Sequence, residues 1–79
     1  MRLDQYITVS PEVQFGKPVF KGTRVPVESL FFHLERGLSI NDFLEDFPGV
    51  SKEQAEAILE SAAQLFQSSN WRKFDEIIA

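Results

Sequence analysis

The stretch from Phe15 to Val27 constrains the fold more than any other part of the chain. It reads FGKPVFKGTRVPV and holds two glycines, two prolines and three cations. Glycine permits backbone conformations that other residues avoid, whereas proline fixes φ and removes a hydrogen-bond donor. Such a segment cannot build a core by itself, and it is too hydrophobic for an ordinary linker. We therefore expect a shaped ribbon that presents Lys17, Lys21 and Arg24.

Two short strands are predicted ahead of the helices. Residues 6–9 are aromatic and β-branched and are followed by Ser-Pro, and residues 18–20 are bounded by glycines. Pro18 confines the second segment to a strand start or a sheet edge. Because an isolated hairpin is marginal in water, we expect this one to pack on helices or on another chain.

Helical periodicity begins at residue 27 and predicts three helices. Pro26 suits the first position of the first helix, and Gly37 suits the position just after its end. Apolar residues recur at helical spacing in each helix and are expected to face the core. They are Val27, Leu30, Phe31 and Leu34 in the first helix, Ile40, Phe43, Leu44 and Phe47 in the second, and Ala55, Ile58, Leu59, Ala62, Leu65 and Phe66 in the third.

Serine caps mark the starts of the second and third helices. Ser39 is followed three residues later by Asp42, and Ser51 is followed at the same spacing by Gln54, which completes a capping-box pattern. A Pro-Gly pair at residues 48–49 separates the two helices.

The predicted fold is mainly α, with a β ribbon at residues 6–26 and a trihelical, helix-turn-helix-like arrangement at residues 27–67. Together these make one small domain of residues 1–67, followed by an amphipathic tail at residues 68–79. A chain of 79 residues buries only about 60% of its unfolded surface, so its stability is marginal. We therefore expect a homodimer, because pairing adds core.

The charges are unevenly placed along the chain, whose net charge is −4. Residues 1–26 carry a net +2, whereas residues 27–79 carry a net −6. Proteins that bind nucleic acid usually present a basic face, so the helical part is a poor surface for DNA or RNA. Any such contact has to come from the ribbon.

Composition also limits the setting of the protein. The chain has no cysteine, so it has neither a disulfide nor a thiolate metal site. No apolar run approaches the roughly 20 residues that span a bilayer, and the first residues lack the apolar core of a signal peptide. A cytoplasmic protein is the expectation.

Residues suited to catalysis are few. His33 is the single histidine, and it lies one position beyond the core stripe of the first helix, where a half-exposed structural role is favoured. Asp42, Glu45 and Asp46 share one side of the second helix, where a solvated face is favoured over a Mg²⁺ site. No phosphate-cradling glycine motif is present. We expect no catalytic residue, no metal and no cofactor.

DNA binding through the third helix is opposed by its own charges. The helix begins with Lys52 and Gln54, which could contact DNA, but Glu53, Glu56 and Glu60 would face or flank a polyanion. The cations of the ribbon could instead grip a phosphate backbone. The alternative for those cations is a local role, either solvated or paired with carboxylates of the second helix.

The tail fits a protein-binding role better. Tryptophan and arginine dominate interface hot spots, and an amphipathic segment lying in a groove is a recurring recognition mode. The alternatives are that the tail folds back onto its own core or pairs within a homodimer. The candidate partner-binding residues are Trp71, Arg72, Lys73, Phe74 and Ile78.

The ribbon also resembles a known family. The run from Gly16 to Val27, GKPVFKGTRVPV, is similar to the signature of a bacterial and archaeal family, domain of unknown function 433. The resemblance continues through Gly-Leu-Ser at residues 37–39 and Asp-Phe-Pro at residues 46–48, and it covers roughly residues 6–66. Phe15 departs from the pattern, since relatives often carry a second glycine there.

The resemblance implies a small helix-turn-helix-like domain with an N-terminal β element. Members of the family are commonly regarded as antitoxin-like and tend to be paired with a PIN-like ribonuclease, so the chain would bind and neutralise such a toxin, with autoregulatory DNA binding as a further role. The resemblance implies no catalytic residues. The residues that match the signature, and that are candidates for a nucleic-acid or partner contact together with Lys21, are Gly16, Lys17, Pro18, Gly22, Thr23 and Arg24.

Two other functions remain open at this point. One is a helix-turn-helix transcriptional regulator that acts on DNA alone, and the other is a plain interaction domain that shares only the family's structure.

Thr23 also has a purely structural interpretation. Its hydroxyl can close the turn that follows Gly22.

Overall fold

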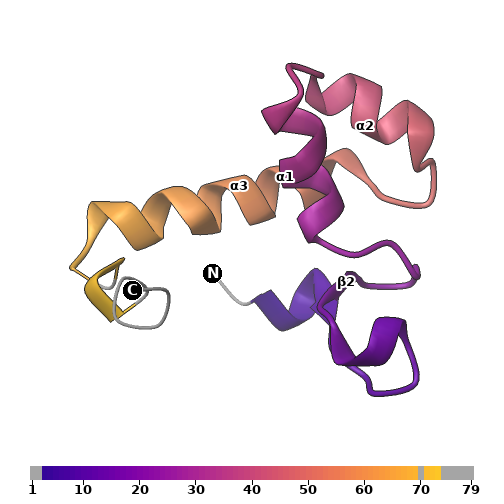
Figure 1. The fold of residues 1–79 in the computed structure, drawn as a ribbon, viewed down its shortest axis with the longest axis horizontal. Coiled ribbons are helices and arrows are strands. Elements are labelled where there is room, and N and C mark those ends of the chain that lie inside the picture. The colour runs from indigo at the N-terminus through magenta and orange to yellow at the C-terminus, as the bar shows by residue number, and fades with distance from the viewer. Residues whose placement is uncertain (1–2, 70, 74–79) are drawn as a thin grey trace.

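The structure is a computed structural model, and it describes residues 3–69 and 71–73. Three α-helices follow a two-stranded hairpin, which confirms the predicted mainly helical fold with an N-terminal hairpin. Figure 1 shows how the helices are arranged over the short β ribbon. The elements are the 3₁₀ turn η1 (Leu3–Gln5), β1 (Ile7–Thr8), the 3₁₀ turn η2 (Gln14–Gly16), β2 (Val19–Phe20), α1 (Glu28–Glu35), α2 (Ile40–Asp46) and α3 (Lys52–Gln67).

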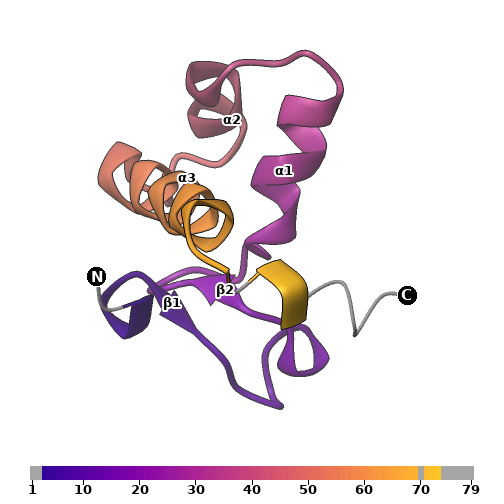
Figure 2. The same cartoon turned by 90° about the vertical axis from the view of Figure 1, so that its left-hand side faces the viewer.

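The two strands form an antiparallel hairpin that closes one side of the core. Ile7 lies opposite Phe20, and Thr8 lies opposite Val19. Both residues of β2 are buried, because this strand packs beneath the helices (Figure 2). The hairpin is therefore stabilised by packing on the helices, one of the two arrangements expected from the sequence.

Aromatic and aliphatic side chains from all parts of the fold meet in one core. Phe20 of the ribbon and Phe43 of α2 are both fully buried, with ring centres 5.8 Å apart. Burial of one such side chain is worth about 1.5–3 kcal/mol, so this contact holds the ribbon to the helices. The other buried members of the cluster are Leu30, Val50, Ala55 and Ile58.

α1 begins later than its sequence predicts. Pro26 is not the first helical residue, because it forms an isolated antiparallel bridge with Val19, and α1 starts at Glu28. The Val27 N–H donates to the Pro18 carbonyl at 2.9 Å, so the ribbon continues through Pro26 before the helix can begin. Gly37 does follow the end of α1 as predicted, with a φ of +83°.

The capping predictions for α2 and α3 are confirmed. Ser39 accepts a hydrogen bond from the Asp42 N–H at 3.1 Å, and its own N–H donates to the Asp42 carboxylate at 2.8 Å. Ser51 and Gln54 make the same reciprocal pair, at 3.1 and 2.9 Å. Each box satisfies two of the four N–H groups left free at a helix start.

Only the first half of α3 enters the core. Ala55, Ala57 and Ile58 are buried, whereas Phe66 is 66% exposed, so its predicted place in the core is wrong. Figure 1 shows the reason, because the C-terminal half of α3 extends past α1 and α2. The apolar periodicity continues to residue 66, but α1, α2 and the ribbon do not reach far enough along α3 to cover its last apolar side chain.

Candidate partner-binding site

An apolar groove lies along the C-terminal half of α3. Its volume is about 520 Å³, within the range of ligand-binding clefts, and the ribbon and the start of α1 form its other walls. The described lining residues are Leu3, Ile7, Lys17, Pro18, Val27, Glu28, Phe31, Ile58, Ser61, Ala62 and Leu65. The two charged residues among them, Lys17 and Glu28, form an ion pair at 2.7 Å. The groove therefore suits apolar side chains better than a charged substrate.

The described part of the tail presents an aromatic ring and two cations. Trp71 is 40% exposed, and the guanidinium carbon of Arg72 lies 5.5 Å from the centre of its ring. This distance is within reach of a cation–π contact, which favours one orientation of the arginine. Lys73 is exposed beside them. Phe74 and Ile78, the other predicted partner-binding residues, lie outside the described residues.

Thr23 closes the turn that joins β2 to the start of α1. Its hydroxyl donates to the Phe20 carbonyl at 2.7 Å and accepts from the Val25 N–H at 3.0 Å. Gly22, with a φ of +80°, supplies the left-handed residue that the turn needs. The predicted turn-closing role of Thr23 is confirmed. The Gly-Thr-Arg part of the signature thus has a structural basis at its first two residues.

The cations of the ribbon differ in how far they are engaged. Lys17 pairs with Glu28 of α1, so the expected alternative of a carboxylate on the second helix is wrong for this residue. The Lys21 ammonium donates to the Asp4 carbonyl at 3.2 Å. Arg24 is exposed, and its guanidinium has no hydrogen-bond or ion-pair partner among the described residues. Arg24 is therefore the ribbon cation best placed to meet a partner.

The turn before Lys17 is left-handed over three residues, which the sequence did not reveal. Gln14, Phe15 and Gly16 have φ values of +51°, +56° and +88°. The Gln14 side-chain amide donates to the Arg24 carbonyl at 3.1 Å and ties this turn to the next one. The Phe15 ring is 99% exposed, so no packing offsets its unfavourable backbone conformation. A glycine at this position would fit the turn without strain.

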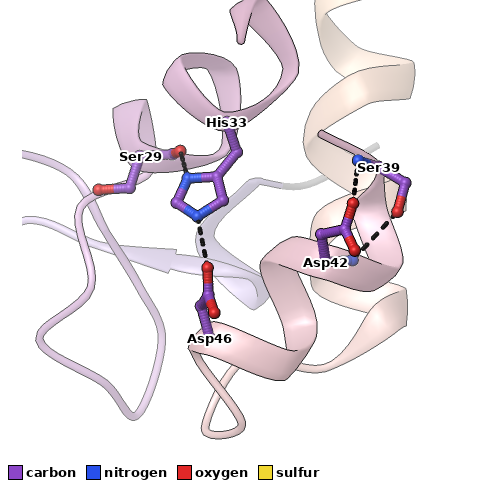
Figure 3. A network of polar contacts seen from close by, with 5 residues as sticks. All are labelled: Ser29, His33, Ser39, Asp42 and Asp46. Carbon is purple, nitrogen blue, oxygen red and sulfur yellow. Dashed lines mark hydrogen bonds and ion pairs between the residues drawn. The ribbon is translucent and has the colours of Figure 1, made fainter. Parts of the chain in front are cut away.

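His33 links α1 to α2 (Figure 3). Its Nε2 lies 3.0 Å from Asp46 Oδ2, and its Nδ1 lies 3.0 Å from the main-chain carbonyl of Ser29. The Ser29 hydroxyl points away from the ring in this view, so the three residues do not form a nucleophilic triad. The ring also packs edge-on against Phe43 and Phe47. The arrangement supports the structural role expected for this histidine.

Asp42 and Asp46 of α2 are engaged individually, each with a different partner. The Ser39 N–H and hydroxyl hydrogen-bond to Asp42 and lower the pKa of its carboxyl below the ordinary value, with a smaller effect from His33. Asp46 pairs with His33 (Figure 3). Within residues 3–69 and 71–73, no three His, Cys, Asp or Glu side chains come together as metal ligands. The same part of the chain holds no helix long and apolar enough to cross a membrane.

The structure places the predicted site residues from Lys17 to Arg24 in two different surroundings. Lys17 and Pro18 line the groove, whereas Lys21, Gly22, Thr23 and Arg24 belong to a turn that does not line it. The groove itself escaped sequence reasoning because its walls are far apart along the chain. The one available signal was the apolar stripe of the third helix, which continues beyond the length that a core of this size can cover.

Gln54 is a second residue whose role the sequence showed only in part. Besides capping α3, its side-chain amide donates to the carbonyls of Lys21 and Tyr6, at 3.0 and 3.3 Å. One side chain therefore joins the start of α3 to both strands of the ribbon. The capping pattern predicts the role of the Gln54 side-chain oxygen, which accepts from the Ser51 N–H. No local pattern predicts that the side-chain nitrogen binds the ribbon, because its acceptors lie more than thirty residues away along the chain.

Comparison with known proteins places the chain in one family. No curated protein and no solved structure matches it. A family described as "Protein of unknown function (DUF433)" matches residues 7–62, which run from β1 through most of α3. The match includes the ribbon and both capping boxes, and it ends before Leu65 and the tail. The chain belongs to the DUF433 family.

Proposed function

We propose that this protein is a non-enzymatic antitoxin that binds and neutralises a partner toxin of the PIN-like ribonuclease type. The observation that carries the proposal is the Trp71–Arg72 pair, an exposed ring with a guanidinium 5.5 Å from its centre, beyond the end of α3. Exposed tryptophan and arginine are the residues that most often dominate binding energy at interfaces. The separate engagement of the α2 carboxylates fits a binding protein better than an enzyme.

A cation offers a direct route to neutralising such a nuclease. PIN-like nucleases use clustered carboxylates with Mg²⁺, and a guanidinium binds a carboxylate through two parallel hydrogen bonds. Inserted among those carboxylates, Arg72 or Lys73 would compete with the metal of the toxin. Arg24 on the ribbon is the other candidate, because its guanidinium has no partner among the described residues.

Co-purification tests the proposal. The chain is expressed with the product of its neighbouring reading frame, and the mass of the eluted complex is measured by light scattering. We expect a stable hetero-complex that contains a homodimer of this chain, and a neighbour that is toxic when expressed alone. A chain that elutes without its neighbour would contradict the proposal.

A matched pair of variants then locates the surface. Substituting Trp71→Ala together with Phe74→Ala is expected to weaken the complex at least 100-fold, because a hot-spot residue contributes 2 kcal/mol or more. Phe32→Ala is the control, since Phe32 is a comparably exposed aromatic (49%) on α1. Equal affinity in the double variant and the control would refute the role of the tail.

The regulator that acts on DNA alone is the second candidate. Arg24 is the observation in its favour, but Lys17 is paired with Glu28, and Glu53, Glu56 and Glu60 are exposed along α3. A gel shift at low and moderate salt, with and without neutralised ribbon cations, separates the two candidates. Sequence-specific binding with a steep salt dependence would support the regulator.

A further inference from the structure

We propose that the apolar groove is the docking site of the chain's own C-terminal segment, residues 74–79. This proposal concerns the free chain, before any toxin is bound, and so goes beyond the proposed function. The segment reads FDEIIA and lies outside the described residues. The inference rests on the path of the chain that leads to it, its length, and the fit of its side chains to the groove.

The described chain beyond α3 lies on the side of that helix that carries the groove. Ser68 leaves the helix in an extended conformation, and the Arg72 N–H donates to the Ser69 carbonyl at 3.2 Å within a new turn. Figures 1 and 2 both place the turn at residues 71–73 on the side of α3 that faces the ribbon. Leu65, near the end of α3, is a wall of the groove. The chain beyond Lys73 therefore starts on the groove side of α3.

The segment is long enough to cross the groove. Along α3 the groove runs from Ile58 to Leu65, and seven helical residues correspond to a rise of about 10 Å. Six residues span up to about 20 Å when extended and about 9 Å when helical. Either conformation lets residues 74–79 lie along α3 between its end and the start of α1.

The side chains of the segment match the groove in number and kind. Phe74, Ile77 and Ile78 recur at i, i+3 and i+4, a spacing that in a helix would place three large apolar groups on one face. A cavity of about 150 Å³ holds one benzene-sized group, so a groove of about 520 Å³ has room for roughly three. Asp75 and Glu76, the two polar residues of the segment, lie between these apolar positions in the sequence.

Docking of the segment couples two events. Phe74 and Ile78 are candidate partner-binding residues, and in the groove they are hidden from a partner. A toxin that binds them must first displace the segment, and its apparent affinity falls by the fraction of chains whose segment is docked. The groove then sets how readily the free chain presents its tail.

Two neighbouring alanines on α3 give a matched test in the full chain. Ala62 lines the groove, whereas Ala63 is exposed and does not line it. Ala62→Gln places an amide among apolar groups and is expected to weaken docking about tenfold, and Ala63→Gln is expected to leave it unchanged. Trp71, the single tryptophan, reports the outcome through its emission wavelength and its quenching by acrylamide. Circular dichroism verifies that both variants stay folded.

Nuclear Overhauser contacts identify the occupant. In uniformly ¹³C-labelled protein we expect contacts from the Ile77 and Ile78 methyl groups to Leu65 and Phe31. An isotope-filtered experiment on mixed labelled and unlabelled chains should show none, because the contacts are within one chain. Contacts seen only in the filtered experiment would show that a second copy of the chain fills the groove. The absence of contacts in both experiments would show that the segment does not occupy the groove, which would then be open to a partner protein. Either result overturns the proposal. If Ala62→Gln unfolds, Ile77→Ser replaces it, with loss of the Ile78 contacts as the expected result.

Discussion

Replacing Phe15 with glycine should stabilise the protein although it removes a large apolar side chain. The ring is 99% exposed and contributes no packing, whereas the backbone at φ +56° is left-handed. That conformation costs a residue with a Cβ about 1–2 kcal/mol. Glycine avoids this cost but adds about 0.4–1 kcal/mol of backbone entropy to the unfolded chain. The net gain expected for Phe15→Gly is therefore about 0.5–1 kcal/mol.

Urea unfolding followed by far-UV circular dichroism measures this gain. With a slope of about 1 kcal/mol per molar urea, typical of small domains, the midpoint should rise by about 0.5–1 M. Phe15→Ala is the control, because it removes the ring and keeps the Cβ, and it should leave the midpoint nearly unchanged. A glycine variant no more stable than the alanine variant would refute the assignment of strain to this residue.

Three further predictions follow from hydrogen bonds described above. Thr23→Val keeps the shape of the side chain but removes the acceptor of the Val25 N–H and one of the two hydrogen bonds to the Phe20 carbonyl, which retains the Thr23 N–H. It should therefore cost about 1–3 kcal/mol in the same urea assay, with the exposed Ser69→Ala as a control. Gln54→Glu keeps the oxygen that caps α3 but replaces the donor amide with a second acceptor, which faces the carbonyls of Tyr6 and Lys21. It should therefore destabilise the protein more than Gln54→Ala does. A larger loss of stability in Gln54→Ala would contradict the link between Gln54 and the ribbon. The pKa of Asp42 is lowered in the folded state, so its contribution to stability is present above the unfolded value of about 3.9 and is lost as pH falls through the folded value. Asp42→Asn removes this contribution and should make the free energy of unfolding depend less on pH at the acid end. An unchanged pH dependence would argue against the shift.

Local chemistry explains which parts of the fold could be predicted. Ser39 and Ser51 cap helices because their partners lie three residues away, and Gly37 ends α1 because the chain needs a left-handed residue there. Such signals are complete within a few residues. The core stripes of α1 and α2 are predictable for the same reason, since each helix has only one face that can be buried.

Contacts between distant segments explain what could not be predicted. Pro26 forms an antiparallel bridge with Val19 and so belongs to the ribbon, although its sequence context suits a helix start. Phe66 continues an apolar stripe past the point where α1 and the ribbon can cover it. The groove follows from the same mismatch between the length of α3 and the size of the core. The candidate tail residues could be named from composition, whereas the position of Trp71 and Arg72 beyond the end of α3 required the structure.

The length of α3 beyond the core has a consequence for how the protein opens. We expect amide hydrogens around Ala55 and Ile58 to exchange only when the whole domain unfolds, because those residues are buried with Phe20 and Phe43. The last two turns of α3, which end at Gln67, can fray without disturbing that core. Whatever fills the groove therefore sets the opening free energy of these turns. In a living cell, the same contact would decide how long the end of α3 stays protected from proteases.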